Sequence, residues 1–515
     1  MSDFVNIELL PAGTTLRVPR GTALQDLLFA HGVEFPCGGR GRCKGCRIRI
    51  KSGILAVSQA DQERLSSAEI SDGWRLACQA KAESDLAIEL AQWEATILSD
   101  DSVFPFTPQA GLGLAVDLGT TTIVAQLVNL RTGHVLGVRT ALNRQAKHGA
   151  DVMSRVEFAV AGGGHETLRQ LARDQIGELV RELMSSAGDR REEGCDGADD
   201  LRSVVVVGNS VMHHVFCDRS LEPLSCFPFE PRHPELHTFA ASDLGWDWAS
   251  SASVTFLPCL GGFVGSDILA GILATNLHRS DSLVALIDLG TNGEIVVGNR
   301  ERMLCASTAA GPAFEGARIS MGMRAATGAI SEVILRDGAL HCHVLGQATA
   351  RGICGSGLVD AVAVGLDSGR IQPSGRLTSA GSLALTGTVS LTQGDVRELQ
   401  LAKGAIAAGL RILLEQWGAS LSDLHCIYLA GAFGNYINRS SAHRIGLLKL
   451  PPEKVIPAGN TALLGAKIAL FDLAKHNGAY PEVLAKVSHV SLNEDARFQE
   501  IFVEEMSFPD CSGSL

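Results

Sequence analysis

Four cysteines near the amino terminus form the most specific chemical pattern in this 515-residue sequence. Their spacing is C-x5-C-x2-C-x31-C, whereas the remaining cysteines of the thirteen are scattered singly. Thiolates at such spacing are typical of a 2Fe–2S cluster, for which C-x4-C-x2-C…C is the plant-type pattern. Structural zinc more often uses two short cysteine pairs, and only one short pair is present, so zinc and inert thiols stay as alternatives. The predicted cluster ligands are Cys37, Cys43, Cys46 and Cys78.

The cysteine loop is rich in glycine, with Gly38, Gly39, Gly41 and Gly45. Glycines let the backbone wrap tightly, so that amide N–H groups can point at the cluster sulfurs. The loop and the segment WRLACQ at 74–79 resemble the adrenodoxin-like branch of the 2Fe–2S ferredoxins. That resemblance implies Cys37 and Cys43 on one iron, and Cys46 and Cys78 on the other. Strands are expected at 5–9, 16–18, 47–50 and 86–90, with a helix starting near Thr22.

A second pattern is an Asp-Leu-Gly-Thr turn that occurs twice, in LAVDLGTTTIVAQLV at 114–128 and in ALIDLGTNGEIVVG at 285–298. Each copy lies between two apolar runs, and the copies are one domain length apart, which predicts two similar α/β halves. The glycine permits close backbone approach, the threonines offer hydroxyls and amides to phosphate, and the aspartate can hold a Mg²⁺-bound water. One copy would fit an ordinary turn. Two copies predict a nucleotide site.

These motifs resemble the ASKHA superfamily of actin, sugar kinases and chaperone ATPases, in which two ribonuclease-H-like lobes close over ATP. The resemblance assigns residues 117–122 to the first phosphate motif, 288–294 to the second and 428–434 to the adenosine motif. It implies connecting helices at 258–270 and 458–469, with small residues where they approach each other. Lys403 is expected near the adenosine, or else as a solvated helix lysine. The implied residues for ATP and Mg²⁺ are Gly119, Thr120, Thr121, Thr122, Gly290, Thr291, Asn292, Gly293, Lys403, Gly431, Ala432 and Gly434, and the expected catalytic set is Asp117, Asp288 and Glu294. Glu294 is expected to polarise the attacking water, with a Mg²⁺-shell carboxylate or a structural carboxylate as the alternatives.

The predicted fold class is a multidomain α/β and α+β protein, in which a β-grasp ferredoxin domain precedes a two-lobed ribonuclease-H-like ATPase. The expected boundaries are 1–95 for the ferredoxin domain, 96–110 for a linker and 111–280 for the first lobe, which carries an ordered insertion at 225–250. The second lobe is expected at 281–480 and a carboxy-terminal extension at 481–515. Asn209, in the loop that leaves a valine-rich strand, is expected near the active site because of its position.

Composition narrows the classes of partner. With 46% hydrophobic and 19% charged residues, the chain has ample apolar surface for packed cores, which excludes global disorder. The net charge of −12 and the lack of a basic tract argue against nucleic acid or an anionic membrane as the main partner. No apolar run is long enough to span a bilayer and the first residues lack a basic leader, so we expect a cytoplasmic protein.

The combination of a 2Fe–2S domain with an ASKHA ATPase resembles the reductive activators of corrinoid proteins. The stretches VVGNSVMHH, STAAGPAFEGARISMGMRA, RGICGSGLVDA and LAKGAI also look like that family. The resemblance implies an ATP-hydrolysing enzyme that passes one electron to Co(II) cobalamin and regenerates Co(I) in a methyltransferase system. The implied partners are a corrinoid protein and an external electron donor, and a homodimer is left open. Two other functions stay open: a small-molecule kinase with a redox-sensing cluster, and a nucleotide-gated electron-transfer module.

Overall fold

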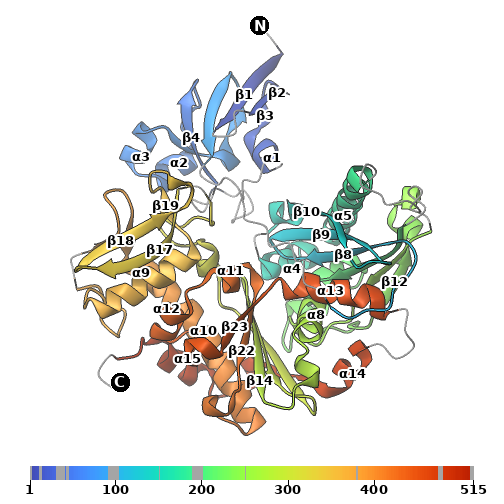
Figure 1. The fold of residues 1–515 in the computed structure, drawn as a ribbon. Helices are drawn as coiled ribbons and strands as arrows, with labels where there is room; N and C mark the ends of the chain where they lie inside the picture. Colours follow the sequence, from blue (N-terminus) through green and yellow to red (C-terminus); the bar gives the residue numbers. More distant parts are fainter. Residues whose placement is uncertain are drawn as a thin grey trace.

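The computed structural model describes residues 3–10, 14–29, 41, 46–90, 104–149, 151–187, 201–249, 251–326, 328–378, 381–473 and 479–510. Figure 1 shows three parts along the chain: a small amino-terminal domain in blue, a first lobe in teal and green, and a second lobe in yellow to red. In chain order they are the ferredoxin domain, the first lobe and the second lobe.

The ferredoxin domain is built on a five-stranded sheet in the order β2-β1-β7-β4-β5. β1 (Phe4–Leu10) and β2 (Thr14–Pro19) form a hairpin, and β7 (Leu86–Leu90) pairs with β1 in parallel, as in a β-grasp. β1 alternates exposed and buried residues, so one face of the sheet is in the core. The strands lie where the sequence predicted, with β4 (Arg47–Ser52) and β5 (Trp74–Leu76) completing the sheet. The helix prediction was wrong at its start: Thr22 lies in the short β3 (Thr22–Ala23), and α1 spans Leu24–Phe29.

Each lobe contains a six-stranded sheet, and five strands of each sheet follow one common order. The orders are β10-β9-β8-β11-β13-β12 and β23-β22-β14-β15-β16-β24. In each, an antiparallel meander of three strands is joined through its first strand to two parallel strands. The sixth strand is added at the parallel-strand edge of the first sheet and at the meander edge of the second. This common order confirms the predicted duplication of ribonuclease-H-like halves. In the first lobe the strands are β8 (Leu112–Leu118), β9 (Thr122–Asn129), β10 (Val135–Leu142), β11 (Leu201–Val207), β12 (His237–Ala240) and β13 (Ser253–Phe256). In the second they are β14 (Val284–Leu289), β15 (Gly293–Gly298), β16 (Met303–Thr308), β22 (Ile427–Ala430), β23 (Val455–Gly459) and β24 (Val487–His489).

Two helices, α8 (Ser266–Ala274) and α13 (Thr461–Asp472), form a shared core with the facing sides of both sheets. They cross closely because Gly465 lies on the backbone of Ala270, where an added Cβ would come within 2.1 Å of the carbonyl oxygen. The predicted close approach of the connecting helices is therefore confirmed. Their predicted starts were wrong, because residues 258–265 and 458–460 lie outside both helices, and Gly265 is the N-cap of α8. α13 also packs on β8 and β11, so it belongs structurally to the first lobe.

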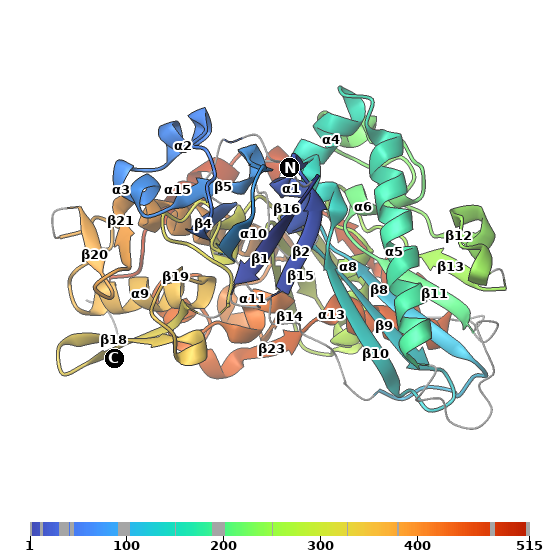
Figure 2. The same cartoon turned by 90° about the horizontal axis from the view of Figure 1, so that it is seen from above.

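Further helices cover the outer faces of the two sheets. α4 (Val152–Val160), α5 (His165–Ala187) and α6 (Ser210–Phe216) cover the first, while α10 (Gln393–Trp417) packs on the second. α9 (Gly355–Asp367) packs instead on a smaller sheet of the second lobe. Figure 2, seen from above, shows α5 running along the outside of the first lobe. The insertion predicted at 225–250 is ordered in its described part, and supplies the edge strand β12. In the second lobe, β17 (Ala329–Arg336), β18 (Ala339–Val344) and β19 (Gly352–Ile353) form a small separate sheet.

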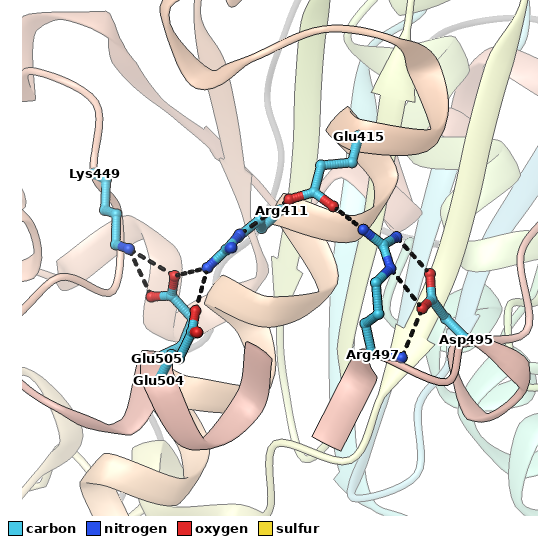
Figure 3. Close-up of polar contacts among 7 residues, drawn as sticks. All are labelled: Arg411, Glu415, Lys449, Asp495, Arg497, Glu504 and Glu505. Atoms are coloured by element: carbon cyan, nitrogen blue, oxygen red, sulfur yellow. Dashed lines mark hydrogen bonds and ion pairs between the residues drawn. The ribbon is translucent and has the colours of Figure 1, made fainter. Parts of the chain in front are cut away.

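The carboxy-terminal segment is part of the second lobe. β24 extends its sheet beside β16, and α15 (Phe498–Met506) packs along α10. Figure 3 shows the ion pairs that join α15 and the turn before it to α10, with Arg411 and Arg497 both contacting Glu415. Glu505 of α15, almost fully buried, pairs with Lys449 at 2.7 Å. A separate extension beginning at 481 therefore does not describe this region.

The end of the predicted linker is packed as well. Phe106 contacts Phe471 of α13 with ring centroids 4.5 Å apart, and Phe104 contacts the same ring at 5.5 Å. Residues 96–103 of that linker lie outside the described residues. None of the helices in the described ranges combines the length and the apolarity needed to cross a lipid bilayer.

Candidate nucleotide and cluster sites

The two Asp-Leu-Gly-Thr turns occupy equivalent places, at the ends of β8 and β14. Alternation along the strands puts Leu114, Val116 and Leu118 in the outer core and Ala115 in the shared core, so Asp117 projects toward the space between the lobes. By the same alternation Leu286 is in the shared core, and Asp288 projects to that side of its own sheet. In both turns the glycine amide closes the turn with a hydrogen bond to a following carbonyl. The Gly119 amide donates to the Thr122 carbonyl at 3.1 Å, and the Gly290 amide donates to the Asn292 carbonyl at 3.0 Å.

Four carboxylates surround the region where the lobes meet: Asp117, Asp267, Asp288 and Glu294. All four side chains keep partial solvent exposure. Burial, and for Asp117 the neighbouring Asp288, raises the pKa of Asp117 to about 7, and burial raises that of Asp288 to about 6. Burial together with Asp267 and Asp288 raises the pKa of Glu294 well above its usual range. The mutual influence of Asp117, Asp267 and Glu294 with Asp288 shows that these carboxylates share one site.

Asp267 was missed in the sequence analysis. It lies in the first turn of α8, and burial with Asp117 and Asp288 nearby raises its pKa to about 8. Asn460, also missed, is the N-cap of α13, where its side-chain oxygen accepts from the Leu463 amide at 2.9 Å while its amide donates to Asp117 at 3.3 Å. Both helices of the shared core thus begin at the carboxylates, and helix amino termini favour anions. Neither residue belongs to a repeated motif, although both lie within the segments predicted as connecting helices.

The first turn is held from behind by hydrogen-bond donors. Asn143 donates to the Gly119 carbonyl at 2.8 Å, and Asn209 donates to the Thr120 hydroxyl at 2.9 Å. Asn209 thus lies at the turn, as its position in the sequence suggested. Arg155 of α4 is fully buried and donates to the Thr120 carbonyl. Burial lowers the pKa of Arg155 to about 9, with only Asp151 opposing this effect among nearby charges. A buried guanidinium behind the turn is a source of positive potential for phosphate.

The second turn has acidic neighbours instead. Thr291 donates through its hydroxyl to Glu315 at 2.7 Å, and burial raises the pKa of that carboxyl. Glu294 lies directly across the hairpin from Asp288 and accepts from the Ser307 hydroxyl at 3.3 Å. Asn292 is partly exposed at the turn, and Gly293 is buried at the start of β15.

The predicted adenosine motif forms the end of β22 and α11 (Gly431–Tyr436). Gly431 has a φ of +84°, and a Cβ there would lie 2.6 Å from the Asp288 carboxylate. The backbone of this motif therefore touches the second phosphate motif directly. Ala432 and Gly434 follow in the same helix, and Gly434 packs against Leu429. These contacts place the motif beside the carboxylates, where a nucleotide would need it.

Lys403 occupies a different kind of environment. It is fully buried in α10, donates to the Ser507 carbonyl at 2.7 Å and lies over the Phe508 ring. Burial, which outweighs the opposing effect of Glu505, lowers the pKa of its ammonium to about 8. The alternative of a solvated helix lysine was therefore wrong, and its role at the adenosine stays a prediction.

Of the four predicted cluster ligands, Cys46 and Cys78 are in the described part, whereas Cys37 and Cys43 lie outside the described residues. The two described segments are joined because the Ala77 amide donates to the Cys46 carbonyl at 3.1 Å. Cys46 is almost fully buried, and the Gln79 side-chain amide points at the Cys78 sulfur at 3.8 Å. Gly41 has a φ of +66°, and a Cβ there would meet Ala60 at 2.9 Å. Sheltered thiolates with amide donors suit an iron–sulfur cluster.

Comparisons with known protein families follow the three parts of the chain. Residues 7–83 match the 2Fe–2S iron–sulfur cluster binding domain, residues 112–280 the RACo middle region, and residues 282–514 the C-terminal domain of RACo, the ASKHA domain. The corrinoid activation enzyme RamQ of Eubacterium limosum is 34% identical over 448 residues, which cover 80% of this chain and 74% of that protein. The chain belongs to the RACo family of corrinoid activators.

Other members agree with this assignment. The [Co(II) methylated amine-specific corrinoid protein] reductase of Methanosarcina barkeri is 27% identical over 430 residues, 77% of either chain. A solved structure, titled reductive activator for corrinoid, iron–sulfur protein, matches over 98% of both chains with a TM-score of 0.67 and 27% identity. The family supports the 2Fe–2S cluster and ATP binding predicted from the sequence, and confirms the combination of a ferredoxin domain with an ASKHA domain.

Proposed function

We propose that this activator uses ATP to reactivate a corrinoid protein, transferring one electron from its 2Fe–2S cluster to the substrate Co(II) corrinoid and so regenerating Co(I). The decisive observation is that the thiolate loop and two facing phosphate turns occur in one chain whose relatives are corrinoid activators. When bound, the cluster supplies the electron, which it receives beforehand from an external donor protein or reductant.

The proposed cluster ligands are Cys37, Cys43, Cys46 and Cys78. The chain's own contribution is to hold the thiolates in a sheltered loop and to direct donors, such as the Gln79 amide, at sulfur. Such hydrogen bonds stabilise the extra negative charge of a reduced site and help to set its potential.

For the nucleotide, we propose that the phosphates lie between the two turns, with Thr120, Thr121 and Thr122 on one side and Thr291 on the other. Arg155, behind the first turn, contributes positive potential to that position. Asp117, Asp267 and Asp288 are the proposed ligands of Mg²⁺, directly or through water, because hard oxygen donors suit this ion. Burial raises the pKa values of all three, with neighbouring carboxylates adding to the effect at Asp117 and Asp267, and a cation there would favour their charged forms.

Glu294 is the proposed group that orients and polarises the attacking water. It lies across the hairpin from Asp288 and accepts a hydrogen bond from Ser307 at the end of the second turn, and a carboxylate in such a position can act as a general base. Closure of the lobes around the nucleotide would bring the groups on both turns together, and the free energy of that closure is available to favour electron transfer to a reluctant acceptor.

The test is an anaerobic mixing experiment. Reduced protein is combined with a Co(II) corrinoid protein, with or without MgATP, and the Co(I) absorption band is followed. We expect Co(I) to form faster with MgATP, and a Cys78→Ser variant to give none. Equal rates with and without MgATP would refute the coupling. Phosphorylation of a small molecule in the absence of corrinoid protein would favour the kinase alternative.

A further inference from the structure

Residues 142–146, called here the coupling segment, join the end of β10 to the short helix η2 (Arg144–Lys147) in the first lobe. One side of the segment holds the first phosphate turn. The Asn143 side chain donates to the Gly119 carbonyl at 2.8 Å, and the Asn143 backbone amide donates to the Thr121 carbonyl at 2.8 Å. Asn143 is fully buried, so water does not compete for these bonds.

A second contact passes through a neighbouring residue of the same segment. The side-chain oxygen of Gln145 accepts from Arg155 at 3.1 Å, and Arg155 in turn donates to the Thr120 carbonyl. Gln145 and Arg155 are both fully buried. Three successive carbonyls of the phosphate turn are therefore bonded to the coupling segment, directly or through one guanidinium.

The other side of the coupling segment faces the ferredoxin domain. Leu142 and Ala146 pack against the hydrophobic core that includes Ile7, Ile48 and Cys46. These two residues flank the pair that holds the turn, so a single short segment contacts both functional parts. The ferredoxin domain also reaches the second lobe, where Glu89 of β7 pairs with Arg351 at 3.3 Å. In both views of the ribbon the domain lies over the two lobes (Figures 1 and 2).

We propose that the coupling segment transmits nucleotide occupancy of the first phosphate turn to the ferredoxin domain. The inference rests on the proposed function and names the residues by which ATP acts on the electron-donating domain. Phosphate bound to the amides of the turn would shift the carbonyls that Asn143 and Arg155 hold. Packed, fully bonded groups move together rather than deform independently. The shift therefore reaches Leu142 and Ala146, and changes how the ferredoxin domain is seated.

The main test is Ala146→Glu, which places a charge against the ferredoxin core and leaves the bonds to the turn intact. The matched control is Ala161→Glu, at the exposed carboxy-terminal cap of α4 in the same lobe. Hydrogen–deuterium exchange of residues 46–90 is measured with and without a non-hydrolysable ATP analogue and Mg²⁺. We expect the analogue to change exchange in the unaltered protein and in the control, and to have no effect in Ala146→Glu. An unchanged analogue effect in Ala146→Glu would overturn the proposal.

Activity supplies a second measurement on the same variants. We expect Ala146→Glu to keep its ATP hydrolysis within about two-fold while losing the acceleration of Co(I) formation by MgATP. Leu142→Ala is a milder change at the same contact, and it should lose part of the analogue's effect on exchange and part of the acceleration by MgATP. It serves as a second variant in case the charged one misfolds. Full acceleration in both variants would contradict the proposal. If MgATP fails to accelerate Co(I) formation even in the unaltered protein, the proposed function fails, whereas the exchange experiment still tests the coupling segment.

Asn143→Ala removes the side-chain hydrogen bond from the coupling segment to the Gly119 carbonyl of the phosphate turn. If one path carries the signal, Asn143→Ala and the milder Leu142→Ala together should reduce the analogue's effect on exchange by less than the sum of their separate losses. Additive losses would show two independent routes and contradict the single segment.

Discussion

The two phosphate turns share a motif and a fold but differ by one residue in length. In the first lobe four residues separate the paired Leu118 and Ile123, whereas in the second three separate the paired Leu289 and Gly293. The shorter turn shifts the register, so that Asp288 faces Glu294, while Asp117 faces Val124. The first turn is accordingly backed by amides and a guanidinium, and the second by carboxylates. The difference supports the proposal that phosphate is held at the first turn and water is activated at the second.

Removing the Glu294 carboxylate, which has no counterpart at the first turn, should give the largest effect on ATP hydrolysis. Glu294→Gln keeps the shape and the bond to Ser307 but cannot take a proton. We expect kcat for ATP hydrolysis to fall about 100-fold or more, within the usual range for general bases, with little change in nucleotide affinity. Steady-state ATPase assays and nucleotide titration measure the two quantities. A large loss of affinity with unchanged kcat would instead assign Glu294 to metal binding.

Removing the Arg155 guanidinium behind the first turn should weaken the binding of ATP. Arg155→Met should raise KM for ATP about ten-fold, equivalent to about 1.4 kcal/mol, because the positive charge behind the phosphate-holding turn is removed. Arg155→Lys should recover part of the affinity. Arg173→Lys is the matched control, since Arg173 donates to the Phe216 carbonyl at the end of α6 in the same lobe, whereas Arg155 donates to the turn itself. Loss of kcat at unchanged KM in Arg155→Met would contradict the proposed role of the first turn.

The energetic importance of the contact between the adenosine motif and the second turn can be measured through the free energy of unfolding. At Gly431 the backbone is left-handed and an added Cβ would contact Asp288. Gly418 has a nearly equal φ of +85°, but an added Cβ there would meet open space. An alanine at either position should cost about 1–2 kcal/mol of unfolding free energy from the backbone conformation. Gly431→Ala should lose more, and should also lose ATPase activity. Equal losses in denaturant unfolding would show that the approach to Asp288 has no energetic consequence.

The smallest expected effect is a pH dependence of stability. Asp117, Asp267 and Asp288 have pKa values raised from 3.8 to about 7, 8 and 6, so the folded state without Mg²⁺ binds more protons than the unfolded chain between these limits. Its unfolding free energy should therefore fall as the pH rises from 6 to 8.5. Asp267→Asn should flatten this slope, whereas the exposed Asp281→Asn should not. Thermal unfolding at several pH values, with and without MgATP, measures the effect, and a slope unchanged in Asp267→Asn would contradict it.

Most of the architecture was predictable because it depends on local patterns. The repeated turns predicted two hairpins, and alternation predicted the strands on either side of them. Helix starts were less predictable. Thr22 has the residue type of an N-cap, yet its hydroxyl donates to the Pro19 carbonyl and the residue pairs within a strand. Lys403 lies on a predicted helix, but its burial depends on a carboxy-terminal segment about 100 residues later in the chain.

The sequence by itself determined the chemistry available: a quartet of thiols at ligand spacing and two glycine turns carrying an aspartate, since such motifs are local in the chain. The tertiary structure decided which further groups join them. Asp267, Asn460 and Arg155 reach the turns only because α8, α13 and α4 pack there. Side chains brought together by packing carry no shared pattern along the chain, because their spacing follows from the arrangement of helices and sheets.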